Sequence, residues 1–193
     1  IDGYFTHMPG IHIVYPSNAA DAKALLKTAC RINDPVLFLE HKGLYRQNFA
    51  SSKEPDENTF LEFGKGAYAA KGSDLTIVTW GAIVQKSIEA AKRLDISADI
   101  IDIRTLYPLD LDIIKESISK TNRVIIAHED NITSGFGAEI SAIISEKYFE
   151  MLDAPILRVA SENIPIAYSG VLEDKILVQT DWIENAIKKI INF

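Results

Sequence analysis

The stretch HEDNITSGFGAE, from His128 to Glu139, concentrates side chains that could do chemistry. A histidine and two acids precede a glycine-rich turn that opens a predicted helix. Imidazole and carboxylate groups can exchange protons near neutral pH, and a glycine-rich turn at a helix start can bind a phosphate. The segment is therefore either a catalytic or phosphate-binding loop, or only the bend between a buried strand and its crossover helix.

The glycines of this segment match neither common nucleotide motif. Ile140 stands where G-x-G-x-x-G needs its third glycine, and the Walker lysine is absent. A tight strand-to-helix turn that needs positive φ or a close backbone approach explains Gly135 and Gly137, and we favour this interpretation. Ligands bind at the carboxyl ends of parallel strands, so a ligand-binding site formed by His128, Glu129 and Asp130 is the alternative interpretation.

The other three histidines could each act as a general base or a metal ligand, but none has a second ligand at metal-binding spacing. His12 lies inside a strand-like run, which favours a packed or strand-edge histidine. His41 belongs to the charged segment Glu40 to Arg46, which follows an apolar strand and is either ligand-facing or a solvated loop. His7, in FTHMPG, is the remaining catalytic candidate.

Two acids near the end of a later helix form another candidate. The segment EKYFEMLDAP presents Glu150 and Asp153 where the helix dipole makes carboxylates mildly unfavourable. They are either partner-binding residues or ordinary surface acids.

Strands and helices alternate along the chain. The predicted strands are Ile11 to Pro16, Pro35 to Glu40, Leu75 to Trp80, Ala98 to Ile103, Arg123 to Glu129 and Pro155 to Ala160. The first predicted helix begins after a cap at Ser17 or Asn18 and continues in SNAADAKALLKTACRI, which ends at Ile32. The other predicted helices span about Val84 to Leu94, Leu111 to Ser119, Gly137 to Met151 and Trp182 to Ile191. Since the strands are continuous apolar runs, helices should cover both faces of a doubly wound, mostly parallel sheet, and the fold class is α/β.

Composition narrows the function classes. The net charge of −7 argues against a nucleic-acid or anionic-membrane partner. Cys30 is the single cysteine, which favours a reducing compartment, and no apolar run approaches the roughly 20 residues of a membrane span. We expect a cytoplasmic protein. The chain begins with Ile1 inside an apolar pattern, so we interpret it as a piece of a longer protein.

Several segments, taken in order, resemble one family. HMPGIHIVYPSNAADAKALLKTA, NDPVLFLEHKGLYR, DLTIVTWG, DIIDIRTLYPLD, HEDNITSGFGAEI and LDAPILRV are similar to the β-subunit, or β-half, of thiamine-diphosphate-dependent 2-oxo acid dehydrogenases of the pyruvate or 2-oxoisovalerate type. This family lies within the transketolase superfamily. Alternatives are a non-catalytic assembly module or a relative such as deoxyxylulose-phosphate synthase.

The resemblance implies a domain division. Residues 1–46 resemble the end of a pyrimidine-binding domain, residues 47–65 a linker, and residues 66–193 a transketolase C-terminal-type domain. It implies thiamine diphosphate and Mg²⁺ in the full enzyme, with a K⁺ ion as a further candidate. The family's catalytic glutamate and histidine are not in this chain, so we expect neither catalysis nor cofactor binding from it alone.

The resemblance also implies partners. They are an α-subunit or α-half, a second β-subunit, and the basic subunit-binding domain of the acyltransferase core. Asp153, Glu150 and the carboxylate of Phe193 match the family's core-docking positions. The resemblance implies that His128 to Asp130 make contacts between domains or subunits and are not catalysts. A structural monovalent cation held by backbone carbonyls maps onto Ala29, Ile32 and Asp34.

Overall fold

The computed structural model describes residues 2–193; Ile1, which opens the predicted pyrimidine-binding segment, lies outside the described residues. The strands are β1 (His12–Val14), β2 (Val36–Phe38), β3 (Ala67–Ala70), β4 (Leu75–Thr79), β5 (Ala98–Asp102), β6 (Thr105–Tyr107), β7 (Val124–Asn131) and β8 (Leu157–Ser161). The helices are α1 (Asp2–Thr6), α2 (Ala19–Ala29), α3 (Ile83–Arg93), α4 (Leu111–Thr121), α5 (Phe136–Tyr148), α6 (Gly170–Glu173) and α7 (Thr180–Ile191), with short 3₁₀ turns η1 (Lys42–Leu44), η2 (Asn48–Ala50) and η3 (Phe149–Met151).

The strands form two sheets. The larger has five strands in the order β3-β5-β4-β7-β8, parallel except for β3. The smaller has the order β2-β1-β6, in which β1 and β2 are parallel and β6 is antiparallel to β1. Because β6 follows β5 directly in the sequence, the chain passes from one sheet into the other there.

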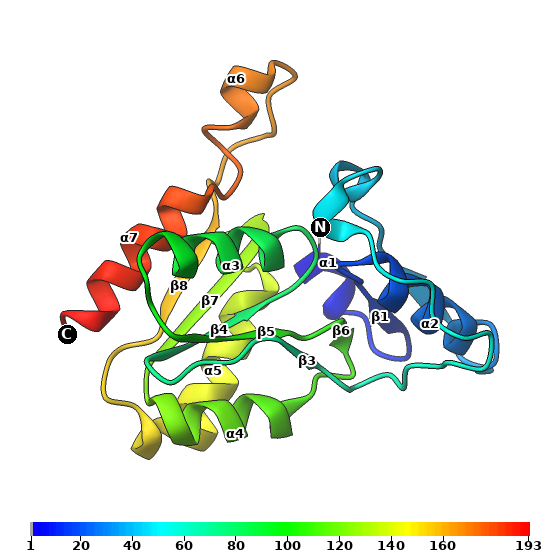
Figure 1. Cartoon of the computed structure of the whole chain (residues 1–193), viewed down its shortest axis with the longest axis horizontal. Helices are drawn as coiled ribbons and strands as arrows, with labels where there is room; N and C mark the ends of the chain where they lie inside the picture. The colour runs from blue at the N-terminus through cyan, green and yellow to red at the C-terminus, as the bar shows by residue number, and fades with distance from the viewer. Residues whose placement is uncertain (1) are drawn as a thin grey trace.

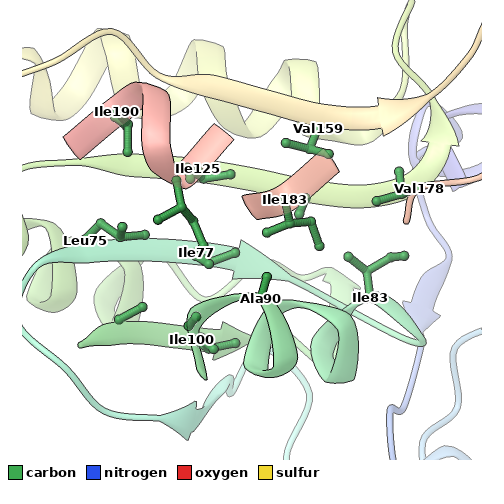
Figure 2. Packing of buried hydrophobic residues seen from close by; sticks show 14 of the residues in the cluster. Leu75, Ile77, Ile83, Ala90, Ile100, Ile125, Val159, Val178, Ile183 and Ile190 are labelled. Atoms are coloured by element: carbon green, nitrogen blue, oxygen red, sulfur yellow. The ribbon is translucent and has the colours of Figure 1, made fainter. Parts of the chain in front are cut away.

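Helices cover both faces of the five-stranded sheet, with α3 and α7 on one side and α4 and α5 on the other (Figure 1). Neighbouring residues in one strand serve opposite cores: Ile77 packs with the first helix pair, as Figure 2 shows, and Val78 with the second. The prediction of a doubly wound, mostly parallel α/β sheet is confirmed.

Caps in the sequence set several helix ends. The side chain of Asn18 accepts a hydrogen bond from Asp21 N at the start of α2, and Asp110 accepts from two backbone N–H groups of α4. Asn122 ends α4 in the left-handed conformation, with φ 56°. Local chemistry therefore fixes where these crossover helices begin and end.

Some elements differ from the predictions. The helix expected to continue toward Ile32 ends at Ala29, and the one expected to reach Met151 ends at Tyr148 and becomes 3₁₀. The strands β3 and β6 and the helices α1 and α6 were missed because each is five residues or shorter and carries no strong period. Among the described residues, no helix has the length and apolar character to cross a bilayer.

Candidate functional site

Two polar segments singled out from the sequence meet at the junction between the sheets. His41, just beyond β2, places its Nε2 atom 3.0 Å from each carboxylate oxygen of Glu129 on β7. This hydrogen bond raises the pKa of the His41 imidazole, more than partial burial lowers it. Both side chains are about three-quarters buried. The pair therefore joins the two sheets through a charge-assisted contact.

His128, next to Glu129, is completely buried. Its ring stacks on the indole of Trp80, with centroids 5.1 Å apart and an angle of 5° between the planes. Among the described residues neither ring nitrogen has a hydrogen-bond partner. Burial lowers the pKa of His128 to about 4, so the imidazole is neutral at neutral pH. Enclosed in this way, His128 acts as a packing residue and cannot reach a ligand.

The glycines of the same segment make room for this imidazole. A Cβ atom at Gly135 would lie 2.7 Å from Cε1 of His128 and 2.2 Å from the carbonyl oxygen of Asn131, and one at Gly137 would lie 2.4 Å from the ring's Nε2. Gly135 has φ −67°, so a left-handed conformation does not explain it. Of the two reasons expected for these glycines, close approach is the one present.

Helix α1 is held at the carboxyl-terminal ends of β4 and β7 in the large sheet. The indole Nε1 of Trp80 donates to the carboxylate of Asp2 at 2.8 Å, and the backbone N–H of Gly3 donates to Asp130 at 2.9 Å. Burial raises the pKa of Asp2, although its bond to Trp80 opposes this. Asp130 thus contacts the first segment of the chain, as Glu129 does through His41.

A second polar cluster connects α2 with the end of β5. The hydroxyl of Ser17 donates to Asp102 at 2.5 Å, and Arg104 binds Asp21 with two hydrogen bonds of 2.7 and 2.9 Å. Asp102 is almost fully inaccessible, and burial raises its pKa to about 6. Arg104 adopts φ 58°, which turns the chain from β5 toward β6. The sequence analysis named Ser17 only as a possible helix cap and assigned no role to Asp21, Asp102 or Arg104, although all four lie in the segments similar to the family.

The remaining histidines are His12 and His7, of which His7 lines a depression with Asp130 beside the junction. His12, on β1, is 3.4 Å from the carboxylate of Asp34, and its ring is 5.4 Å from that of Phe63. His7 is exposed after α1 and lines a surface depression with Ser134 and Gly135. Among the described residues, no group of three or more His, Cys, Asp or Glu side chains could hold a metal ion.

The residues expected to supply carbonyls to a monovalent cation lie around the end of α2. Ala29 is the last residue of that helix, and Asp34 is exposed in the turn before β2. Ile32 lies between them and is half-buried. This cation site stays a prediction.

Two of the three predicted core-docking residues share a surface depression. Asp153 and Phe193 both line it, together with Phe149, and the aromatic rings are each 72% exposed. Asp153 is exposed, and its backbone N–H donates to the carbonyl of Asn122 at 2.9 Å. Glu150 is exposed on η3 but does not line the depression.

Three carboxyl groups of the junction each form a hydrogen bond with a side chain from another part of the same chain. Asp2 contacts Trp80, Asp21 contacts Arg104, and Glu129 contacts His41. Proton transfer to a ligand would need a side chain that is free to reach it. The arrangement therefore supports a rigid connection between two sheets.

Comparison with known proteins identifies the family to which this architecture belongs. Residues 64–183 match the family model of the transketolase C-terminal domain. The chain belongs to that family. Residues 3–48 match the transketolase pyrimidine binding domain. In the transketolase C-terminal domain of this chain, the segment from His128 to Glu139 supplies a buried strand end and a crossover turn.

The curated relatives are β-subunits of 2-oxo acid dehydrogenases. The 2-oxoisovalerate dehydrogenase subunit beta of Bacillus subtilis is 40% identical, over 100% of this chain and 60% of its own. The mitochondrial pyruvate dehydrogenase E1 component subunit beta of Dictyostelium discoideum is 40% identical, over 97% of this chain and 54% of its own. The chain thus spans little more than half the length of these relatives.

A solved structure has the same fold over almost the whole chain. It is described as a split-gene transketolase, inactive β4 tetramer, with a TM-score of 0.78 and 25% identity. The similarity covers 99% of this chain and 60% of that one. The predicted membership of the transketolase superfamily and the predicted fold are confirmed.

Proposed function

We propose that this chain is part of the β-subunit of a 2-oxo acid dehydrogenase, the component that decarboxylates a 2-oxo acid oxidatively and transfers the acyl group to a lipoyl group. The observation that carries the proposal is 40% identity along the entire chain to such a β-subunit. The rival is a non-catalytic assembly module.

The two are separated by reconstitution. The chain, joined to the rest of its β-subunit and combined with an α-partner, should decarboxylate a 2-oxo acid only when thiamine diphosphate and Mg²⁺ are present. Binding to the acyltransferase core without turnover would support the assembly module instead. Pyruvate and 2-oxoisovalerate are the two substrates to compare.

We expect that the described residues alone do not bind the cofactor of such an enzyme. Thiamine diphosphate supplies a carbanion-stabilising ylid when bound, and its diphosphate needs Mg²⁺. The carboxylates beside the segment that matches a pyrimidine binding domain are engaged, with Glu129 on His41 and Glu40 on Tyr45. We therefore expect titration calorimetry with thiamine diphosphate and Mg²⁺ to show no binding to this chain. Micromolar binding would contradict this expectation.

We propose in addition that the chain associates with a second copy and with an α-subunit. Support comes from the large apolar side chains that it exposes and from the β4 assembly of the split-gene transketolase relative. Sedimentation over a concentration series tests self-association. A compact monomer at every concentration would contradict it.

A further proposal concerns docking of the acyltransferase core. A basic subunit-binding domain would contact Asp153 and the carboxylate of Phe193, with Glu150 adding to the negative field. Support comes from the depression that Asp153 and Phe193 share with an exposed phenylalanine. An arginine can bind a carboxylate with two hydrogen bonds, and aromatic rings suit the centre of an interface.

This docking site can be tested by substitution. Asp153→Ala, or an extension past Phe193, should weaken binding of the subunit-binding domain by more than about tenfold, since removing one partner of a desolvated charge pair costs about 2–5 kcal/mol. Glu146→Ala is the matched control, because Glu146 is an exposed acid outside the depression. Equal binding by the parent and both changed chains would place docking elsewhere.

The monovalent cation is proposed at the carbonyls of Ala29, Ile32 and Asp34. A bound ion stabilises the folded state by mass action. The unfolding midpoint should therefore rise when K⁺ replaces a bulky monovalent cation at constant ionic strength. Equal unfolding midpoints in the two salts would contradict the proposed cation site.

A further inference from the structure

Residues 163–175, called the arm below, project from the molecule between β8 and α7 (Figure 1). Hydrogen bonds close the arm at its root: Glu162 N donates to the carbonyl of Ile176 at 3.1 Å, and Asn163 accepts from Thr133 N at 3.1 Å. The arm exposes five large apolar side chains, Ile164, Ile166, Tyr168, Val171 and Leu172. An apolar patch on an anchored, projecting segment indicates an interaction surface.

A groove lies beside the root of the arm, between β8 and α7. Its apolar wall consists of Leu157, Val159, Trp182 and Ala186. Two exposed cations, Arg158 and Lys189, and one exposed acid, Glu162, also line it. The guanidinium of Arg158 donates to the carbonyl of Ile132 at 2.6 Å. Within residues 2–193, β8 is an edge strand of the large sheet, so one side of it is open to a partner. The groove suits a segment that is apolar with a negative end.

The arm has that chemistry. Its exposed Val171 and Leu172 are followed directly by the exposed or half-exposed acids Glu173 and Asp174. The arm projects beyond the ends of β8 and α7 in the same copy (Figure 1). The chain carries a net charge of −7, so two copies repel each other in general. Placing Glu173 and Asp174 beside Arg158 and Lys189 reduces that repulsion locally, even with Lys175 on the arm and Glu162 in the groove.

We propose that the arm of one copy docks in the β8–α7 groove of a second copy, with apolar residues against the groove wall and Glu173 and Asp174 beside Arg158 and Lys189. This inference rests on the self-association proposed above and names its surface.

The arrangement is reciprocal. The root residues Ser161 and Glu162 themselves line the groove, so a two-fold axis near the root brings each arm over the other copy's groove. An isologous contact of this kind closes after two copies. It buries two arms and two grooves together, which helps it to approach the roughly 800 Å² per partner of a stable interface.

Charge exchange provides the test. A groove variant carries Arg158→Glu and Lys189→Glu, and an arm variant carries Glu173→Lys and Asp174→Lys, both in the full 193-residue chain. Each variant alone places like charges together, and self-association measured by sedimentation should weaken by about tenfold or more. Mixing the two variants restores opposite charges at both contacts, so a heterodimer should form.

A matched control carries Lys115→Glu and Lys147→Glu. It changes the net charge as the groove variant does, but these exposed lysines lie on α4 and α5, on the opposite face of the large sheet. It should associate more strongly than the groove variant.

The outcomes separate the two proposals. A parent chain that stays monomeric contradicts self-association itself. A parent that associates, together with groove and arm variants that associate equally well, leaves self-association standing and overturns the arm as its surface. Variants that stay monomeric even when mixed also overturn it.

Disulfide trapping checks the contact if a charge variant does not fold. Cys30→Ser removes the single cysteine, and Leu172→Cys and Asn185→Cys are then placed in separate copies. Oxidation should link the two copies through these positions, because Asn185 lines the groove. An associating parent without this crosslink overturns the inference.

Discussion

The junction between the two sheets differs from two outward surfaces, the arm and the Asp153 depression. The junction and these surfaces use their side chains in opposite ways. At the junction, ionisable residues are buried and contact one another across the chain, as Arg104 does with Asp21. On the two outward surfaces, apolar residues are exposed, such as Tyr168 on the arm and Phe149 in the Asp153 depression.

This difference changes how the sequence should be interpreted. A dense run of His, Glu and Asp first suggests catalysis, yet here those residues hold the sheets together. The surfaces that we propose for partners expose isoleucine, valine, tyrosine and phenylalanine. Substitutions at the junction should therefore reduce stability, whereas substitutions on the outward surfaces should reduce association.

The largest effect is expected from Arg104→Met. It removes the ion-pair partner and two hydrogen bonds of the largely buried carboxylate of Asp21, which keeps the bond from Asn18 Nδ2. Breaking a buried ion pair by removing one partner costs about 3–5 kcal/mol, which urea denaturation would measure. Arg93→Met is the control, since the Arg93 side chain that contacts Glu89 and Glu184 is 54% exposed, and it should change the midpoint little. Equal losses would contradict a structural role of the junction.

The next effect is expected from Gly137→Ala. The added methyl group would lie 2.4 Å from the His128 ring, which the stacked Trp80 holds in place. Overpacking of this kind costs about 1–3 kcal/mol. Gly170→Ala is the control, because an added Cβ meets nothing within 4 Å there.

A double-mutant cycle identifies the clash. His128→Ala opens space, so Gly137→Ala should cost clearly less in that background. Strictly additive losses would show that the glycine is needed for another reason.

Much of the architecture was predictable because its signals are local. The cap at Asn18 and the continuous apolar runs of the parallel strands lie within short windows of the sequence. The junction was not predictable in the same way. Asp2 meets Trp80 across 78 positions, and Arg104 meets Asp21 across 83.

The short strand β6 shows the same limit. Its three residues have no period, and only pairing with β1, more than ninety positions earlier, makes Thr105–Tyr107 a strand. His41 and Glu129 were each candidates, but their contact depends on how the two sheets meet.

A smaller effect concerns pH. Burial raises the pKa of Asp102 from 3.8 to about 6, so its stabilising contribution is full below pH 3.8 and is lost as the pH rises through 6. Burial lowers the pKa of His128 from 6.5 to about 4, so its contribution is present above pH 6.5 and is lost as the pH falls through 4. The two contributions oppose each other across the same window.

Single substitutions should reveal each slope. Asp102→Asn should leave a protein whose stability falls toward pH 4, and His128→Asn one whose stability rises toward pH 4, each by on the order of 2 kcal/mol. Urea midpoints measured between pH 4 and 7 give both slopes. Parallel curves for the parent and both variants would contradict the assignment.

The smallest effect on folding is expected from Val171→Ser on the arm and Phe149→Ser beside Asp153. Both side chains are 71–72% exposed, and surface substitutions usually change stability by less than about 0.5 kcal/mol. Binding to a partner stabilises the folded state by mass action. If the arm mediates self-association, the melting temperature of the parent should therefore rise with protein concentration, and Val171→Ser should remove that dependence. Phe149→Ser should keep it, because its depression lies away from the arm. Loss of the dependence in both variants, or in neither, would mean that the two outward surfaces do not serve separate partners.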